Sequence, residues 1–343
     1  MSRHTAAPTT EPPGLAEAML PDLSTTLAHY GKAADLSAYS LHPLNADSPN
    51  NRLTDEITPT ARIFMRNHHP IPDMRVGKWR LTIDGLVRRP LEISYAELLK
   101  MPRSTYVAVL QGSLKQDHSG TNRLAVANAE WTGVPLALLL EQAGVKMRAK
   151  WADCVGVGDP GYGMTLPLSK LFSDAMLAYA LNEAPLPPAH GGPVRLIVPG
   201  RVGATWVKWI NQITLTAHDH NATTDDAAEA LQVNARIMNP QPGAVLKSAR
   251  TQICGFAWSG GHAIVRVELS IDGGNSWKDA QLLTNFGPRA WRPFLWSWYP
   301  RPGQYTLMAR ATDSRGVTQP LATTEPHTFQ LANTVFPVPV TIV

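Results

Sequence analysis

Alternating apolar and polar positions mark short strands along the first two thirds of the chain, with helical patches between them. WRLTIDGLV and YVAVLQG alternate with the period of a half-buried strand. SYAELLKM has apolar residues at helical spacing, PLALLLEQAGV predicts a helix that ends near Gly144, and LFSDAMLAYALN predicts a third helix. The mixture predicts an α/β domain whose connections are too irregular for a regular βαβ array.

The pattern changes near residues 231–246, where helical spacing disappears. Short alternating runs follow, among them TQICGFAWSG, AIVRVELSID and QYTLMARATD, separated by glycine-rich turns such as DGGNSW. These runs predict an antiparallel β-sandwich of the immunoglobulin type. The sequence thus predicts an α+β protein with a polar tail at 1–50 that wraps over the surface or stays loose. A mixed α/β domain at 51–230 and the β-sandwich at 231–343 follow it.

The composition of the chain limits the classes of partner that it can bind. The 31 basic and 27 acidic residues give a net charge of +4, spread without a dense basic block, which argues against nucleic acid and leaves room for a local anion pocket. The chain has no run of eighteen apolar residues or more, so no membrane partner is expected. The N-terminus lacks an apolar core after its first arginine, which indicates a cytoplasmic protein, or a periplasmic one if a leader was removed. The two cysteines are expected to be buried free thiols.

FMRNHHPIPD places Arg66, Asn67 and His68 in consecutive positions before two prolines. Prolines keep the preceding residues extended, so adjacent side chains point to opposite sides. The segment can therefore present Arg66 to an anion, while a surface turn with a salt-bridged arginine is the alternative interpretation.

PPAHGGPVRLIVPGRVGATWVKW surrounds two glycine turns with His190, Arg195 and Lys208. Glycine lets a backbone approach a ligand closely, and arginine and lysine are the usual partners of a phosphate. The alternative is a loop histidine with a solvated lysine. Asp159, in GDPGYGMTLP, lies in a tight turn that favours an Asx-turn residue. The chain contains no P-loop, HExxH, CxxC or GxSxG pattern.

Taken together, these segments resemble the sulfite oxidase family of molybdenum-cofactor enzymes. The matching motifs run in order from about Ile63 to Pro320 and include FMRNHHPIPD, VAVLQG, WTGVPLALLLEQAG, AWSGG and VRVELSIDGGNSW. The resemblance implies that residues 51–230 form a molybdopterin-binding domain and that residues 231–343 form an immunoglobulin-like dimerisation domain. It also implies a homodimer, a small anionic substrate and a separate electron acceptor.

The same resemblance assigns site residues. Arg66 and Arg289 would orient the anionic substrate. The residues that would surround molybdopterin and its phosphate are Asn67, His68, Gly112, Ser113, Asp159, His190, Arg195 and Lys208.

One departure from the family concerns the strand that ends at residue 112. In the family this strand ends in LQC-A-G-N-R, and the cysteine thiolate binds molybdenum. Here the ungapped match puts Gly112 at the cysteine and Ser113 after it, and an expected arginine corresponds to about Asp117. The metal ligand therefore stays unknown, because glycine offers no donor atom. The tyrosine expected after VKWI is also absent, and HDHNATTDDAAEA, a predicted linker or lid, stands there.

Three functional hypotheses follow. The first is a molybdopterin oxidoreductase with altered metal ligation that performs two-electron oxo transfer on a small oxyanion or S-oxide. The second is a catalytically impaired homologue that binds molybdopterin or a partner protein without turnover. The third is an ordinary sulfite oxidase whose ligand strand is misaligned here.

Overall fold

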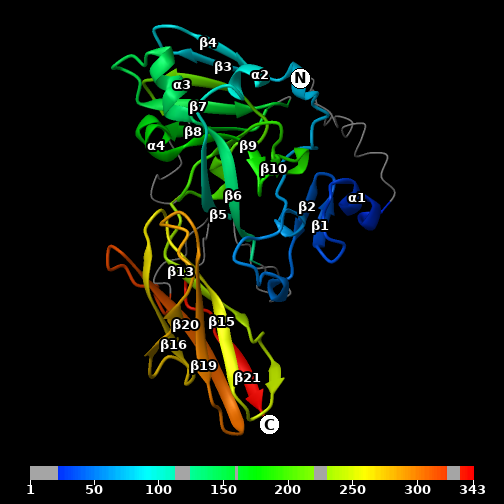
Figure 1. Cartoon of the computed structure of the whole chain (residues 1–343), viewed down its shortest axis with the longest axis vertical. Coiled ribbons are helices and arrows are strands. Elements are labelled where there is room, and N and C mark those ends of the chain that lie inside the picture. Colours follow the sequence, from blue (N-terminus) through cyan, green and yellow to red (C-terminus); the bar gives the residue numbers. More distant parts are fainter. Residues whose placement is uncertain (1–21, 113–123, 159–160, 220–229, 323–332) are drawn as a thin grey trace, which may run out of the picture.

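Two bodies follow one another along the long axis of the molecule. The computed structural model describes residues 22–112, 124–158, 161–219, 230–322 and 333–343. The first domain, with strands and short helices, occupies one end, and the β-sandwich with the C-terminus occupies the other (Figure 1). The predicted α+β fold class is confirmed, with much more strand than helix.

Two five-stranded sheets form the first domain. One has the order β10-β9-β6-β5, with β11 also paired to β9, and the other has the order β4-β3-β12-β7-β8. The strands of the first sheet are β5 (Ser104–Gln111), β6 (Val126–Pro135), β9 (Met176–Leu181), β10 (Ala184–Pro185) and β11 (Arg195–Ile197). Those of the second are β3 (Arg80–Gly85), β4 (Leu91–Ser94), β7 (Trp151–Gly156), β8 (Gly163–Pro167) and β12 (Ile210–Thr216). Only β3 and β12 pair in parallel among these described strands.

Short helices cover these sheets. They are α2 (Tyr95–Leu98), α3 (Leu136–Ala143) and α4 (Leu168–Asp174). The predicted end of α3 is confirmed, because Gly144 follows it with a φ of 66°, the left-handed conformation that glycine adopts readily. No helix in the described part of the chain has the length and apolar character needed to cross a membrane.

The helix predicted for LFSDAMLAYALN is wrong in its second half. The helix α4 ends at Asp174, and Met176–Leu181 is the strand β9. This strand lies between β6 on one side and β10 and β11 on the other. An apolar run that is buried in a sheet carries no two-residue period, so the pattern alone does not separate strand from helix.

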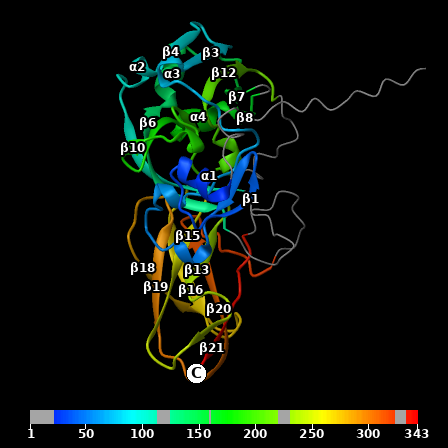
Figure 2. The same cartoon turned by 90° about the vertical axis from the view of Figure 1, so that its right-hand side faces the viewer.

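Part of the predicted N-terminal tail is packed against the first domain. Residues 22–50 contain α1 (Leu23–His29) and a hairpin of β1 (Ser37–Leu41) and β2 (Leu44–Asp47). They lie on the flank of the first domain (Figures 1 and 2). Their buried side chains form a core with residues of the first domain, which contains Leu27, Leu36, Leu44, Ala46, Met65, Ile71, Ala189 and Trp209.

The second domain is the predicted β-sandwich. One sheet has the order β13-β15-β19-β18 and the other β14-β21-β20-β16-β17. The strands are β13 (Asn234–Asn239), β14 (Ala244–Leu246), β15 (Thr251–Trp258), β16 (Ile264–Ser270), β17 (Lys278–Asp279), β18 (Gln281–Leu282), β19 (Arg292–Trp298), β20 (Gly303–Asp313) and β21 (Val338–Ile342). Both sheets contribute to one buried core, Phe294 from the first and Val267 and Leu307 from the second. Both cysteines are free, with Cys154 buried and Cys254 partly exposed.

The second domain holds the outer edge of β5, the strand that ends next to Gly112. The backbone N–H of Val109 donates to the carbonyl of Arg289 at 2.9 Å. The indole N–H of Trp258 donates to Gln111 Oε1 at 2.7 Å, and both side chains are buried. The end of β5 is therefore set by contacts from both domains.

We expect Trp258→Phe to weaken this junction, because Gln111 Oε1 loses its buried donor. An unsatisfied buried acceptor costs about 1–3 kcal/mol, which for a chain of this size lowers the thermal midpoint by roughly 2–10 °C. Differential scanning calorimetry measures the change. Trp277→Phe is the matched control, because its indole donates to Gly274 at 3.0 Å within a turn of the second domain. An equal drop in both variants would contradict a special role for the junction.

Candidate functional site

The buried amide of Asn67 joins the N-terminal hairpin to Lys208. Its backbone N–H donates to Asn45 Oδ1 and its Nδ2 donates to the Leu44 carbonyl, each at 2.6 Å. Its Oδ1 accepts from Lys208 Nζ at 2.7 Å. The structure thus brings two predicted site residues, 141 positions apart in the sequence, into direct contact.

The predicted glycine turn lies against the same lysine. Lys208 Nζ donates to the Ala189 carbonyl at 2.9 Å. Gly191 has a φ of 101°, and a Cβ at this position would lie 3.0 Å from Cα, Cβ and Cγ of Lys208. This close approach requires glycine, because an added methyl group would push Lys208 away.

Arg195 lies at the start of β11, behind this turn, and is almost fully buried. Its Nε donates to the Trp206 carbonyl at 3.1 Å and its Nη1 donates to the His190 carbonyl at 3.2 Å. The guanidinium lies beside two indoles that contact each other, 5.7 Å from the ring centre of Trp131 and 5.9 Å from that of Trp206. These rings stabilise a cation that has left water.

His190, Arg195 and Lys208 form a cluster of basic side chains, and Lys32 is its fourth member. The sequence did not indicate this residue. It follows α1 in the N-terminal segment and is 7% exposed. Its Nζ lies 2.6 Å from the Thr60 carbonyl, 2.7 Å from the Ile63 carbonyl and 2.9 Å from His190 Nε2. A lysine in a polar, weakly periodic stretch gives no signal that would separate it from a solvated one.

The basic side chains of this cluster have no carboxylate partner among the residues that the structure describes. Neither Lys32, Arg195 nor Lys208 forms an ion pair with any carboxylate in the described ranges of the chain. Burial lowers the pKa of Lys32 to about 7 and that of Arg195 to about 9. The pKa values of Lys208 and His190 are well below their usual values, through burial first and then through the neighbouring cations. Since an unpaired buried charge is costly, the cluster is suited to a bound anion.

Arg66 is paired within the protein. Both of its terminal nitrogens contact the carboxylate of Asp47, at the end of β2, with Nη2 at 2.9 Å from Oδ2. The guanidinium also lies over the rings of Tyr39 and Phe64, at 4.9 and 5.5 Å. Its positive charge is therefore already neutralised by a carboxylate, as in the salt-bridged alternative considered from the sequence.

His68 lies next to Asn67 but points to the exposed side of the site. Its ring stacks on that of Tyr162, with 4.5 Å between ring centres and an angle of 10°. Burial, followed by His69 and Lys208, lowers the pKa of its imidazole. A flat, neutral pair of rings beside a cation cluster offers a surface for a planar heterocycle.

Gly112 directly follows β5, and its backbone N–H donates to the Ala125 carbonyl at 2.8 Å. A Cβ built on Gly112 would lie 3.1 Å from the ring of Phe64 and 3.2 Å from Cβ of Ala125. The space of the first side-chain atom is therefore bounded by two apolar groups. Ser113, Asp117 and Asp159 lie outside the described residues, as does most of HDHNATTDDAAEA.

The Arg289 backbone contacts Val109, but its side chain is directed towards the other end of β5. Its guanidinium is 4.9 Å from the ring centre of Tyr106 and its Nε is 3.6 Å from Asp174 Oδ2. Tyr106 and Gly112 are six positions apart on an extended strand, which corresponds to about 20 Å. The structure thus does not bring the Arg289 side chain to the Gly112 end.

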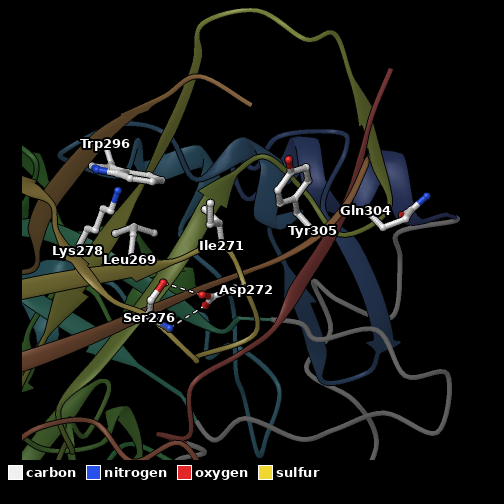
Figure 3. Close-up of a pocket in the computed structure, with 8 residues that line it drawn as sticks. All are labelled: Leu269, Ile271, Asp272, Ser276, Lys278, Trp296, Gln304 and Tyr305. Atoms are coloured by element: carbon white, nitrogen blue, oxygen red, sulfur yellow. Dashed lines mark hydrogen bonds between the residues drawn. The ribbon is translucent and has the colours of Figure 1, made fainter. Parts of the chain in front are cut away.

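A pocket of about 320 Å³ lies in the second domain and is lined by none of the residues of the cation cluster. Figure 3 shows Trp296, Tyr305, Ile271 and Lys278 around it, with Asp272 bonded to Ser276. The hydrogen bonds from Ser276 and Ser270 lower the pKa of the Asp272 carboxyl. The Asp272 carboxylate therefore stabilises this turn, and Lys32, Arg195 and Lys208 do not line this pocket.

Two family profiles cover most of the chain. The profile described as oxidoreductase molybdopterin binding domain matches residues 68–224, and the Mo-co oxidoreductase dimerisation domain matches residues 225–342. Sulfite oxidase from Gallus gallus is 32% identical over 307 residues, which covers 76% of this chain and 67% of the relative. The chain belongs to the sulfite oxidase family. Its first domain is a molybdopterin-binding domain, so the predicted cofactor is confirmed at this level, and its second is a dimerisation domain.

Other relatives in this molybdopterin group differ in length and activity. Mitochondrial sulfite oxidase from Homo sapiens is 32% identical over 290 residues, with 72% of this chain and 53% of the relative covered. Inducible NADH nitrate reductase 1 from Glycine max is 29% identical, and the match covers only 35% of it. The chain thus spans two thirds of the chicken enzyme and about half of the human one. The sulfane dehydrogenase SoxCD structure from Paracoccus pantotrophus superposes with a TM-score of 0.81 at 25% identity, covering 96% of this chain and 92% of that chain.

Proposed function

We propose that this protein binds the molybdenum cofactor through a terminal phosphate at the cation cluster and uses it for two-electron oxo transfer. The observation that carries the proposal is the cluster of Arg195, Lys208 and His190 at a glycine turn. No carboxylate of the described residues pairs with Arg195 or Lys208. A dianionic phosphate provides the missing negative charge, and arginine and lysine are the side chains that bind it best. The donor set therefore fits the phosphate end of the cofactor.

The metal end of the site differs from the phosphate end. Position 112 is a glycine and offers no donor atom, and Phe64 and Ala125 bound the place of its side chain. When bound, the cofactor supplies a metal that exchanges two electrons together with an oxygen atom. We infer that this metal has no protein thiolate at residue 112, so that its electronic character differs from that of a thiolate-bound centre.

The substrate class follows from chemistry shared by the relatives. Their names refer to sulfite, nitrate and sulfane sulfur, which are small groups built on sulfur or nitrogen. The proposed substrate is a small oxyanion or S-oxide. Electrons would leave to a separate acceptor, and the dimerisation domain would join two copies of the chain.

A second function, cofactor binding without turnover, is favoured by the two arginines expected to hold substrate. Arg66 is paired with Asp47 and Arg289 lies beside Asp174, so both cations already have a carboxylate. Together with the glycine at 112, this arrangement suits a carrier as well as an enzyme. Molybdenum and pterin analysis of protein from a cofactor-competent host, followed by turnover of oxyanions and S-oxides, separates the two. One metal per chain with turnover supports the enzyme, one metal without turnover supports the carrier, and neither metal nor pterin contradicts both.

Gly112→Cys tests whether the end of β5 meets the metal. The added side chain requires Phe64 to move by a few tenths of an ångström, which the edge of a ring allows. We expect the visible spectrum of the loaded protein to gain absorption from a thiolate bound to the metal. Gly112→Ala is the matched control, since it adds the same Cβ without sulfur and should leave the spectrum unchanged. Identical spectra for the two variants would show that this strand does not reach the metal.

A further inference from the structure

The N-terminal segment, residues 22–47, reaches the cation cluster through one side chain. Its apolar residues Leu27 and Leu44 share a buried core with Ala189 and Trp209, which flank the glycine turn of the site. The Lys32 side chain extends from this segment into the site, and only 7% of the residue is exposed. Both the segment and Lys32 lie before the stretch matched by the molybdopterin-binding profile, which begins at residue 68.

The contacts of Lys32 decide how it can act. An ammonium group has three hydrogens, and three acceptors surround Nζ within 2.9 Å: the Thr60 and Ile63 carbonyls and His190 Nε2. No hydrogen remains for a ligand, so Lys32 acts through His190. While Nε2 accepts from Lys32, the proton of the neutral imidazole must be on Nδ1.

We propose that Lys32 is a positioning residue of the anion site, which fixes the His190 ring and links docking of the N-terminal segment to occupancy by a phosphate-terminated ligand. The inference rests on the proposed function, because it concerns the site assigned there to the cofactor phosphate. It adds a residue and a segment outside the matched domain to that site. An anion stabilises the ammonium of Lys32, the ammonium holds His190, and the segment that carries Lys32 is held with them.

Protonation of Lys32 links the affinity for an anion to pH, and the direction of this dependence can be derived. Without a ligand, Lys32 loses its proton near pH 7, because burial lowers its pKa to about that value. A bound anion raises that pKa, so binding takes up a proton above pH 7 and weakens as the pH rises. The titratable and charged groups around Lys32 are His190, Arg195 and Lys208. Arg66 also acts on Lys208 but is paired with Asp47, and Arg62 is paired with Asp35. A bound anion favours the protonated form of each of these basic groups as well, so their contributions must be separated from that of Lys32 by mutation.

Sulfate titration of the full-length, cofactor-free chain tests the proposal. Sulfate stays a dianion between pH 6 and 8, so a change in its affinity over this range belongs to the protein. For one linked proton with a pKa near 7 we expect the dissociation constant, measured by thermal shift, to rise about tenfold from pH 6 to pH 8. Lys32→Met should weaken binding at pH 6 and remove this part of the pH dependence. Lys32→Arg should restore binding and keep it at pH 8, since arginine stays charged.

A second readout follows the segment itself. Sulfate should slow proteolysis within residues 22–47 in the wild-type chain and in Lys32→Arg, but not in Lys32→Met. Lys100→Met, which removes an exposed lysine, is the control and should behave like the wild type. If Lys32→Met binds sulfate with unchanged affinity and pH dependence, Lys32 is only structural and this inference is wrong, while the proposed function stands. If Lys208→Met also leaves sulfate binding unchanged, the anion site itself is wrong and the proposed function fails with it.

Discussion

Lys208→Met should lower the cofactor content and leave the protein folded. Hydrogen bonds to charged groups contribute about 1.5–3 kcal/mol, so the loss of one such donor lowers affinity for the phosphate roughly tenfold to 150-fold. The cofactor-free protein should change little, because the substitution removes an uncompensated cation and offsets the unpaired oxygens left on Asn67 and Ala189. Its free energy of unfolding should shift by less than about 2 kcal/mol.

Pterin content and stability are measured separately for this variant. Pterin is released, oxidised to its fluorescent form and quantified per chain, and calorimetry of the same preparation reports unfolding. Arg195→Met should lose pterin as well, and Lys100→Met should keep it. Unchanged pterin in both site variants would refute the assignment of the anion site.

Gly191→Ala should disrupt the same site through the backbone. Its φ of 101° is unfavourable for a residue with a Cβ, and the new methyl group would meet Lys208 at 3.0 Å. We expect a loss of stability of roughly 2–3 kcal/mol together with a loss of pterin. Gly261→Ala has the same backbone requirement, with a φ of 85°, but its Cβ would have no neighbour within 4 Å. It should therefore cost about 1 kcal/mol and keep the cofactor. Equal pterin content in the two variants would show that Lys208 does not depend on this turn.

Residues with local signals were predictable from the sequence. The helix before Gly144 and the alternating strands of the sandwich follow from periods of 3.6 and 2, which a single segment displays. The strand Met176–Leu181 could not be predicted from the sequence, because the strands that pair with it on both sides decide its conformation rather than its own pattern. Here tertiary pairing overrides local propensity.

The candidate site divides in the same way. Asn67, His190, Arg195 and Lys208 were found because motifs carry them, and the structure brings them together. Lys32 was missed because its partner His190 lies 158 residues away and nothing in its own neighbourhood marks it as buried. The pairing of Arg66 with Asp47 is also a property of the folded chain, and it changes what that arginine can do.

The hydrogen bonds from the second domain to β5 have a consequence for biosynthesis. Val109 and Gln111 emerge from the ribosome long before their partners Arg289 and Trp258. At ordinary translation rates the roughly 180 residues between Val109 and Arg289 take about 10–40 s to make. Throughout that interval the outer edge of β5 is an unpaired strand edge in the nascent chain, open to wrong pairing and to chaperones. The end of this strand reaches its final form only when the sandwich is nearly complete, so we expect cofactor insertion to be a late, largely post-translational event.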